Sequence, residues 1–149
     1  MRDADRSRLL TVATQCTAAK LRQTSRALSR FYDEILEPSG LRGTQFSLLV
    51  ALSLMGEAPL LRVADELGLD RTTMTRNLAP LERDGLVASV TGPDRRVRLI
   101  TLTEAGRRRL AKALPLWEKA QRRVIDALGE RRWRELFATL QATAAAGEG

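Results

Sequence analysis

The residues best suited to chemistry in this sequence are its arginines. Lysine and arginine total 25 against 18 aspartate and glutamate residues, which gives a formal net charge of +7 at pH 7. The excess is concentrated in residues 71–109, which carry nine arginines and four acidic residues. Because the planar guanidinium group bonds bidentately to phosphate and to the edge of guanine, this segment favours an anionic partner, double-stranded DNA above all. A solvated surface rich in arginine is the plain alternative.

Histidine is absent and cysteine occurs once, so several kinds of catalytic and metal site are excluded. A Ser-His-Asp triad, a Cys-His dyad, a zinc finger and a 2-His-1-carboxylate iron site cannot form. Catalysis by carboxylates remains, but the pairs Asp33-Glu34 and Asp65-Glu66 are adjacent residues, which point to different sides of a helix. We therefore expect no enzyme activity, no metal and no cofactor.

The sequence also indicates in which compartment of the cell the protein is found. A single cysteine cannot form an internal disulfide, which suits a reducing cytosol. No stretch approaches about 18 uninterrupted apolar residues, and residues 1–8 lack the apolar segment of a signal peptide. We expect a cytoplasmic protein with no membrane span.

Hydrophobic spacing predicts a chain that is mainly α-helical. Apolar residues recur every seven positions from Leu21 to Ile35, which indicates one long helix that has Cys16 near its start and ends at residues 38–40. A shorter, mostly buried helix is expected before Gly56, with the apolar set Phe46, Leu49, Val50, Leu52 and Leu54.

The middle of the chain has the order helix, tight turn, helix and hairpin. A small helix over about residues 61–67 precedes a helix over about 71–84, which Asp70 is placed to cap. Two strand-like runs, 86–91 and 97–102, flank a Gly-Pro turn. This order is that of a winged helix-turn-helix, whose second helix enters the major groove of DNA.

The remaining segments complete the predicted fold. Residues 58–60 are expected to form an extended link, and Thr103 is placed to cap a second long helix. Residues 129–130 separate that helix from a last one. The predicted fold class is therefore mainly α with a small β-hairpin wing, a winged helix-turn-helix combined with long helices.

The helix over residues 71–84 has one apolar and one polar face. On a helical wheel Met74 and Leu81 fall within about 60° of Leu78, whereas Arg76 points roughly opposite. Arginine and threonine on the outer face suit contacts with phosphate, guanine and the thymine methyl group. A solvated polar face is the alternative. The candidate DNA contacts of this helix are Arg71, Thr72, Thr73, Thr75, Arg76 and Arg83.

The hairpin tip supplies a second basic cluster, made of Arg95, Arg96 and Arg98. A thin basic finger fits the narrow minor groove, where the negative potential is strongest. Asp94 would repel DNA unless it pairs with an arginine and orients it. These four residues are candidate DNA contacts, and a plain polar turn is the alternative.

Two stretches of the sequence resemble the MarR family of bacterial transcriptional regulators. They are LDRTTMTR (69–76) with LERDGLV (81–87), and DRR (94–96) leading to LTEAG (102–106). The resemblance implies a homodimer that reads a pseudo-palindromic site, with Asp94 supporting Arg96 in the minor groove. It also implies three parts, which are an N-terminal dimerisation helix (1–42), the winged domain (43–103) and C-terminal dimerisation helices (104–149).

The sequence departs from the family pattern at two positions. Leu61 stands where the family often has a polar cap, which would weaken the start of the small helix. Pro80 lies inside the recognition helix and leaves the Arg76 carbonyl without its helical donor, so we expect a bend toward solvent and no break.

The resemblance further implies a pocket between the dimer helices and the winged domain that accepts a small aromatic carboxylate or phenol. The candidate ligand residues are Arg22, Arg26, Ser29, Arg42 and Phe46, although Arg22 and Arg26 are better suited to surface ion pairs or solvation than to ligand binding. Some family members sense peroxide through a tyrosine-flanked cysteine in the region of Cys16. Here Tyr32 is the only tyrosine and the tyrosine cage is missing, so we expect a buried structural cysteine, and the redox switch is the alternative.

The leading hypothesis is a homodimeric repressor that a small aromatic effector releases from its operator. A redox-sensing repressor acting through Cys16 and a sequence-tolerant architectural DNA-binding protein are the alternatives. Activation of transcription would use the same docking on DNA.

Overall fold

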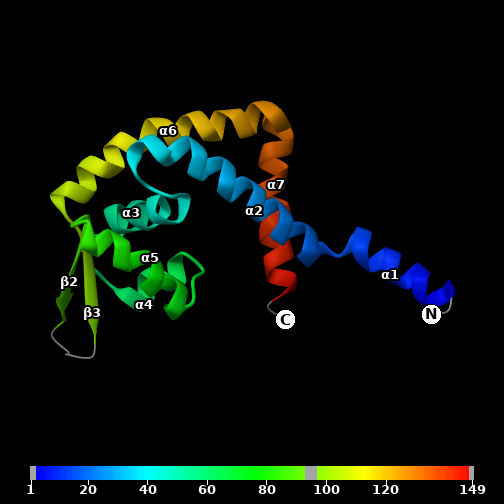
Figure 1. The fold of residues 1–149 in the computed structure, drawn as a ribbon, viewed down its shortest axis with the longest axis horizontal. Coiled ribbons are helices and arrows are strands. Elements are labelled where there is room, and N and C mark those ends of the chain that lie inside the picture. The colour runs from blue at the N-terminus through cyan, green and yellow to red at the C-terminus, as the bar shows by residue number, and fades with distance from the viewer. Residues whose placement is uncertain (1–2, 93–96, 148–149) are drawn as a thin grey trace.

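The computed structural model describes residues 3–92 and 97–147 of the chain. Within these residues it contains seven α-helices, one 3₁₀-helix and three short strands (Figure 1). In chain order they are α1 (Asp3–Gln15), α2 (Thr17–Leu36), the 3₁₀-helix η1 (Glu37–Ser39), α3 (Gly43–Met55), β1 (Ala58–Pro59), α4 (Leu60–Glu66), α5 (Arg71–Arg83), β2 (Val87–Thr91), β3 (Arg98–Leu102), α6 (Glu104–Leu128) and α7 (Glu130–Ala146).

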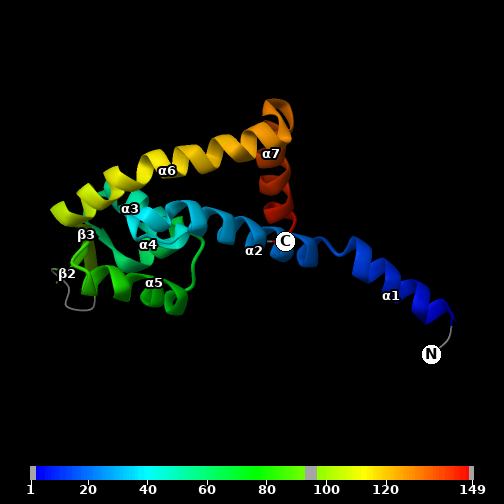
Figure 2. The same ribbon diagram turned by 45° about the horizontal axis from the view of Figure 1, so that its top comes forward.

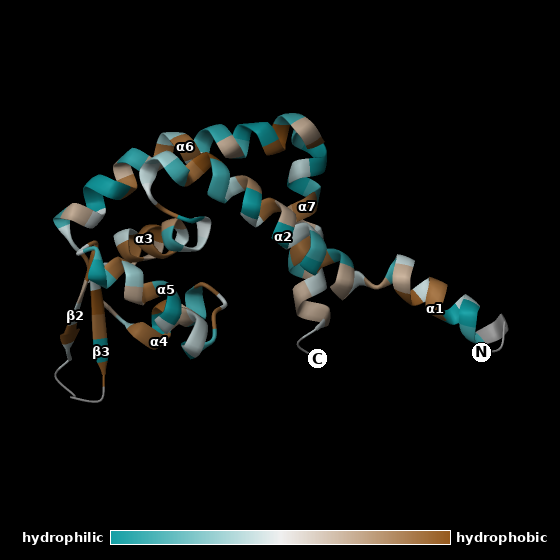
Figure 3. Cartoon of the chain, viewed as in Figure 1, coloured by the Kyte–Doolittle hydropathy of each residue, from teal (hydrophilic) through white to brown (hydrophobic). Residues whose placement is uncertain are grey.

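The segment from α3 to β3 forms the winged domain. Helices α3, α4 and α5 pack on one another and on an antiparallel sheet of strand order β1-β3-β2. Strands β2 and β3 form the hairpin, in register from Val87 opposite Leu102 to Thr91 opposite Arg98. Buried side chains of α3, α5 and β3 share one core, and α3 is the most apolar of these helices (Figure 3). The predicted fold class is confirmed.

Local capping fixes the two helix starts that frame this domain. The Asp70 side chain accepts a hydrogen bond from the Thr73 backbone N–H at 2.8 Å, and the Thr103 hydroxyl accepts one from the Gly106 N–H at 3.0 Å. Both caps satisfy amides that lack partners inside the helix. The predicted caps of α5 and α6 are therefore confirmed.

The long helices lie outside the winged domain. Helices α2 and α6 run side by side above α3, and α7 turns back from the end of α6 toward α2 (Figures 1 and 2). The Tyr32 hydroxyl of α2 donates to Gln121 Oε1 of α6 at 2.6 Å. Phe46 of α3 stacks on Trp117 of α6, with ring centroids 6.1 Å apart. The hydrogen bond joins the two long helices, and the ring stack connects α6 with the winged domain.

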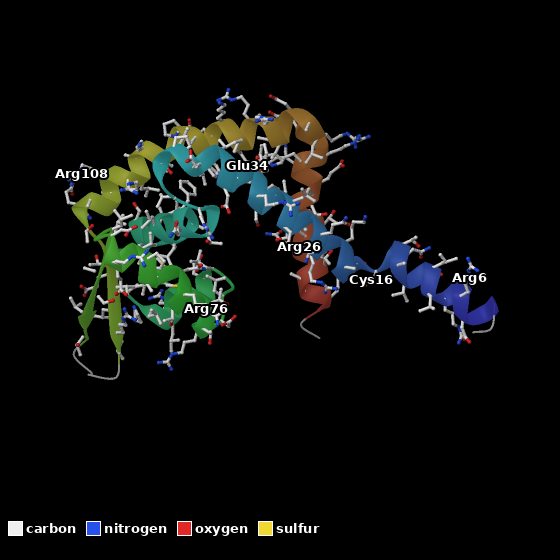
Figure 4. All side chains as sticks on the ribbon, viewed as in Figure 1. Arg6, Cys16, Arg26, Glu34, Arg76 and Arg108 are labelled. Carbon is white, nitrogen blue, oxygen red and sulfur yellow. The ribbon has the colours of Figure 1, made fainter. Side chains whose placement is uncertain are left out.

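The predicted long helix is present as α2, with Cys16 at its N-cap, but a separate helix that was not predicted, α1, precedes it. Cys16 has extended dihedral angles and separates α1 from α2, and α1 extends away from the rest of the chain (Figures 1 and 4). β-Branched residues with weak helix propensity surround the break. The Thr14 hydroxyl also donates to the Leu10 carbonyl at 2.8 Å, a side-chain bond that tends to bend helices.

Two smaller predictions were wrong. Residues 58–59 form a strand, because Ala58 pairs with Ile100 of β3 where a link was expected. Leu54 is 83% exposed although it was assigned to the buried set, since it falls on the outer side of α3. Pro80 lies inside α5 without ending it, as predicted.

Candidate nucleic-acid interface

Helix α5 is anchored through its apolar face. Met74, Leu78 and Leu81 are buried in the core, so the opposite face of the helix is fixed toward solvent. Arg76 lies on α5 on the side of the molecule opposite α6 (Figure 4). Of the predicted residues of α5, Thr72, Arg76 and Arg83 are exposed on this face. Arg71 and Thr75 are also exposed but lie nearer the anchored side of the helix, and Thr73 is half-buried.

The first turn of α5 is held by a network around Asp70. The Thr73 hydroxyl donates to Asp70 Oδ2 at 2.7 Å, in addition to the backbone cap. These hydrogen bonds from Thr73 keep the pKa of Asp70 below its ordinary value. The Thr75 hydroxyl donates to the Arg71 carbonyl at 2.8 Å. Thr73 and Thr75 thus support the helix through the same hydroxyls that were predicted to face DNA.

The last turn of α5 is tied to the hairpin by three polar side chains. Arg98 of β3 forms an ion pair with Glu82, and its Nε donates to Ser89 Oγ of β2 at 2.9 Å. The Ser89 hydroxyl in turn donates to Glu82. Burial alone would raise the pKa of Glu82, but hydrogen bonds from Arg98 and Ser89 and the Arg98 charge bring it below the ordinary value. Arg98 was predicted only as a DNA contact, and its link to Glu82 was not predicted, because the two residues lie 16 positions apart in the sequence.

The hairpin tip lies outside the described residues, and with it the predicted contacts Asp94, Arg95 and Arg96.

The other end of the hairpin is closely packed. The Thr103 hydroxyl donates to the Gly85 carbonyl at 2.7 Å. A Cβ at Gly106 would lie 2.1 Å from the Leu86 carbonyl oxygen, so only glycine fits where α6 crosses the start of β2.

A cavity of about 650 Å³ lies among α2, α3, α6 and α7. Of the predicted ligand residues, Ser29 and Phe46 line it, whereas Arg22, Arg26 and Arg42 do not. Arg22 and Arg26 each follow a lining residue of α2, and successive side chains on a helix point about 100° apart. The polar side chains of the lining are Thr24, Ser25, Ser29, Tyr32, Asp33, Thr44 and Ser47.

Most of these cavity residues were not predicted from the sequence. Ser25, Ser29 and Tyr32 follow helical spacing along α2, which was the available signal. Trp117 also lines the cavity, but it comes from α6 and is far away in sequence. Burial raises the pKa of the Tyr32 hydroxyl, which bonds to Gln121. A smaller cavity of about 420 Å³ adjoins the first, since Phe46, Ser47 and Trp117 line both.

Three other features bear on function: the single cysteine, possible metal ligands and helices that could span a membrane. Cys16 is partly exposed at the α1–α2 junction, so it is not the buried cysteine expected from the sequence. In residues 3–92 and 97–147, no three His, Cys, Asp or Glu side chains gather as a possible metal site. No helix in the same residues is long and apolar enough to cross a membrane.

Comparison with known proteins agrees with the geometry. No protein-family model matches the sequence. The uncharacterised HTH-type transcriptional regulator YwoH of Bacillus subtilis is 32% identical over 85 residues, which are 57% of this chain and 62% of YwoH, less than two thirds of that relative. The structure of the transcriptional regulator MosR of M. tuberculosis in complex with DNA is 40% identical, with a TM-score of 0.77, and the match covers 89% of this chain and 98% of MosR.

A MarR-family transcriptional regulator from a Rhodococcus species is 28% identical, with a TM-score of 0.74, over 88% of this chain and 96% of its own. The winged domain, the exposed face of α5 and these relatives agree. The chain belongs to the MarR family of winged helix-turn-helix transcriptional regulators.

Proposed function

We propose that this protein is a homodimeric, sequence-specific DNA-binding repressor of the cytoplasm that leaves a pseudo-palindromic operator when a small aromatic effector enters the cavity beside Phe46 and Trp117. The observation that carries the proposal is the exposed face of α5, because a core-anchored helix presents its arginines and threonines outward in a fixed orientation.

The proposed docking places α5 in the major groove. Arg76 is then positioned to bond guanine, and Arg71 and Thr72 of the first turn to bond phosphate. Arg83 contacts the backbone farther along. The wing, with Asp94, Arg95 and Arg96, is proposed to reach the minor groove. MosR, the relative solved on DNA, supports the assignment of the DNA-binding function.

The proposed dimer is supported by apolar side chains that a single chain leaves exposed. These side chains lie on α2, α6 and α7, outside the winged domain. The exposed residues are Leu21, Leu28, Leu114, Leu128, Phe137 and Leu140. Exposed Leu9, Leu10 and Val12 continue this surface along α1, a 13-residue helix that is marginal in water by itself. Apolar surfaces of this kind mark protein interfaces.

The proposed effector response follows from the position of the cavity. Its walls come from α2 and α7, which we assign to the dimer, and from α3 of the winged domain. A ligand there favours one spacing of the two recognition helices over another, and it releases DNA if the favoured spacing fits the operator less well.

Selection from random duplex DNA tests the proposal. Purified protein is titrated on the pool, and the bound fraction is sequenced. We expect enrichment of a two-fold symmetric site with half-sites about one helical turn apart. Binding without an enriched motif, lost at moderate salt, would instead indicate an architectural DNA-binding protein. Adding mild peroxide to the complex, with Cys16→Ser for comparison, tests the redox-sensing alternative.

A further inference from the structure

The cavity is lined by hydroxyl groups and apolar side chains and has a single charged group. Its charged residue is Asp33, and among the described residues no lysine or arginine lines it. Six hydroxyl-bearing residues contribute its other polar groups, and the apolar walls include Leu36, Phe46 and Trp117. A ligand carboxylate would therefore lose water in this cavity without finding a cationic partner, which is costly.

The one feature of the cavity that would attract an anion is the start of α3. The N-terminus of a helix offers free amides and a partial positive charge. Here Asp33 Oδ1 accepts a hydrogen bond from the N–H of Gly43, the first residue of α3, at 2.7 Å. A Cβ at position 43 would lie 3.4 Å from that oxygen and 3.8 Å from Tyr32 Cβ, so α2 and α3 are in close contact there. The protein's own carboxylate thus occupies the anion position.

Building on the proposed effector function, we infer that Asp33 determines ligand specificity: the cavity takes an uncharged, hydrogen-bonding aromatic molecule and rejects aromatic carboxylates. The hydroxyls of Ser25, Ser29 and Thr44 suit amide and phenol groups, which both donate and accept. A second negative charge near Asp33 meets repulsion that is stronger among the apolar walls of the cavity than in bulk water. This inference replaces the aromatic acid expected from the sequence.

Matched ligand pairs test this inference. The full-length protein is titrated calorimetrically with 4-hydroxybenzamide and 4-hydroxybenzoate, and with 6-hydroxy-2-naphthamide and 6-hydroxy-2-naphthoate. Each pair differs in charge at nearly constant shape. We expect the better-fitting amide to bind at least about tenfold more tightly than its carboxylate and to release the selected operator.

The variant Asp33→Asn isolates the charge, because the asparagine carbonyl still accepts from Gly43 N–H. We expect it to strengthen carboxylate binding about tenfold and to leave amide binding within about twofold. Glu34→Gln is the matched control: it removes the same charge from the next, exposed position of α2, outside the cavity lining, and should change neither ligand (Figure 4).

The outcomes separate this inference from the proposed function. Equal or tighter binding of the carboxylate to the natural protein, with operator release, overturns the inference and leaves the effector function standing. An unchanged preference in a folded Asp33→Asn protein also overturns it. Failure of all four compounds to bind, with operator binding intact, overturns the effector function and this inference together. The comparison in the unmutated protein remains decisive even if Asp33→Asn does not fold.

Discussion

Arg98 of β3 and Glu82 of α5 form an ion pair that joins the wing to the helix we assign to the major groove. Ser89 of β2 bonds to both partners, so all three elements meet at one point. An ion pair shared between α5 and the wing, the two elements that we propose contact DNA, restrains the angle between them. It also occupies the Arg98 guanidinium, which gives Arg98 a positioning role in addition to any contact with DNA.

Glu82→Gln should therefore weaken operator binding by about tenfold, measured by fluorescence anisotropy at fixed salt. Electrostatics alone gives the opposite expectation, because the change removes a negative charge beside DNA. Asp84→Asn is the matched control, because it removes one negative charge at the same end of α5. Asp84 does not contact Arg98; its Oδ1 lies 3.7 Å from Arg83 Nε. It should bind DNA as tightly as the natural protein or more tightly. Equal gains in both variants would rule out the positioning role.

The same pair gives stability a pH dependence. The pKa of Glu82 lies below its ordinary value of 4.5 in the folded protein, so the ion pair stabilises the fold fully above about pH 4.5. This contribution is lost as the pH falls through the lowered pKa. Urea unfolding across this range should show the natural protein more stable than Glu82→Gln near neutral pH, with the difference vanishing in acid. A difference independent of pH would contradict the assignment.

Arg76→Ala should lower operator affinity by about 1–3 kcal/mol and relax the base preference at one position of each half-site. The reason is loss of a bidentate contact with guanine from the outer face of α5. Sequencing of the bound pool measures both effects. Arg131→Ala on α7, which removes an exposed arginine paired with Glu135, should leave both unchanged. Normal affinity and preference in Arg76→Ala would exclude the proposed docking.

Gly106→Ala should destabilise the fold by about 2–3 kcal/mol in urea unfolding. Alanine favours a helix by about 1 kcal/mol over glycine, but its Cβ would overlap the Leu86 carbonyl oxygen at 2.1 Å. We expect the cost of this steric overlap to exceed the gain in helix propensity, because the opposing atom belongs to the backbone and cannot easily move away. Lys112→Ala, at an exposed position of α6, should change stability by less than about 0.5 kcal/mol. A Gly106→Ala variant that is more stable than the natural protein would contradict the close packing of α6 on the Leu86 backbone.

Phe137→Asp should shift the protein from dimer to monomer in sedimentation velocity. Phe137 is 52% exposed on α7 in the single chain, and a carboxylate there cannot be buried against a second copy without a large penalty. Leu61→Asp makes the same kind of change at a residue of α4 that is 54% exposed, and it should remain dimeric. A dimer that survives Phe137→Asp would place the interface elsewhere.

Local features of the fold could be predicted from the sequence because neighbouring residues determine them. The burial of Met74, Leu78 and Leu81 follows from helical periodicity, and the Asp70 cap follows from side-chain chemistry three residues away from its donor. The motifs of the recognition helix indicate the MarR family without knowledge of any tertiary contact.

Contacts between distant segments were decided only by tertiary packing. The strand at Ala58 exists because Ile100 lies opposite, and no local pattern specifies that pairing. Arg98 turns toward Glu82, and Asp33 toward Gly43, because folding brings together helices and strands that are separate in the sequence. Periodicity shows which face of a helix is buried, but the partner of each polar side chain depends on which other element packs against that face.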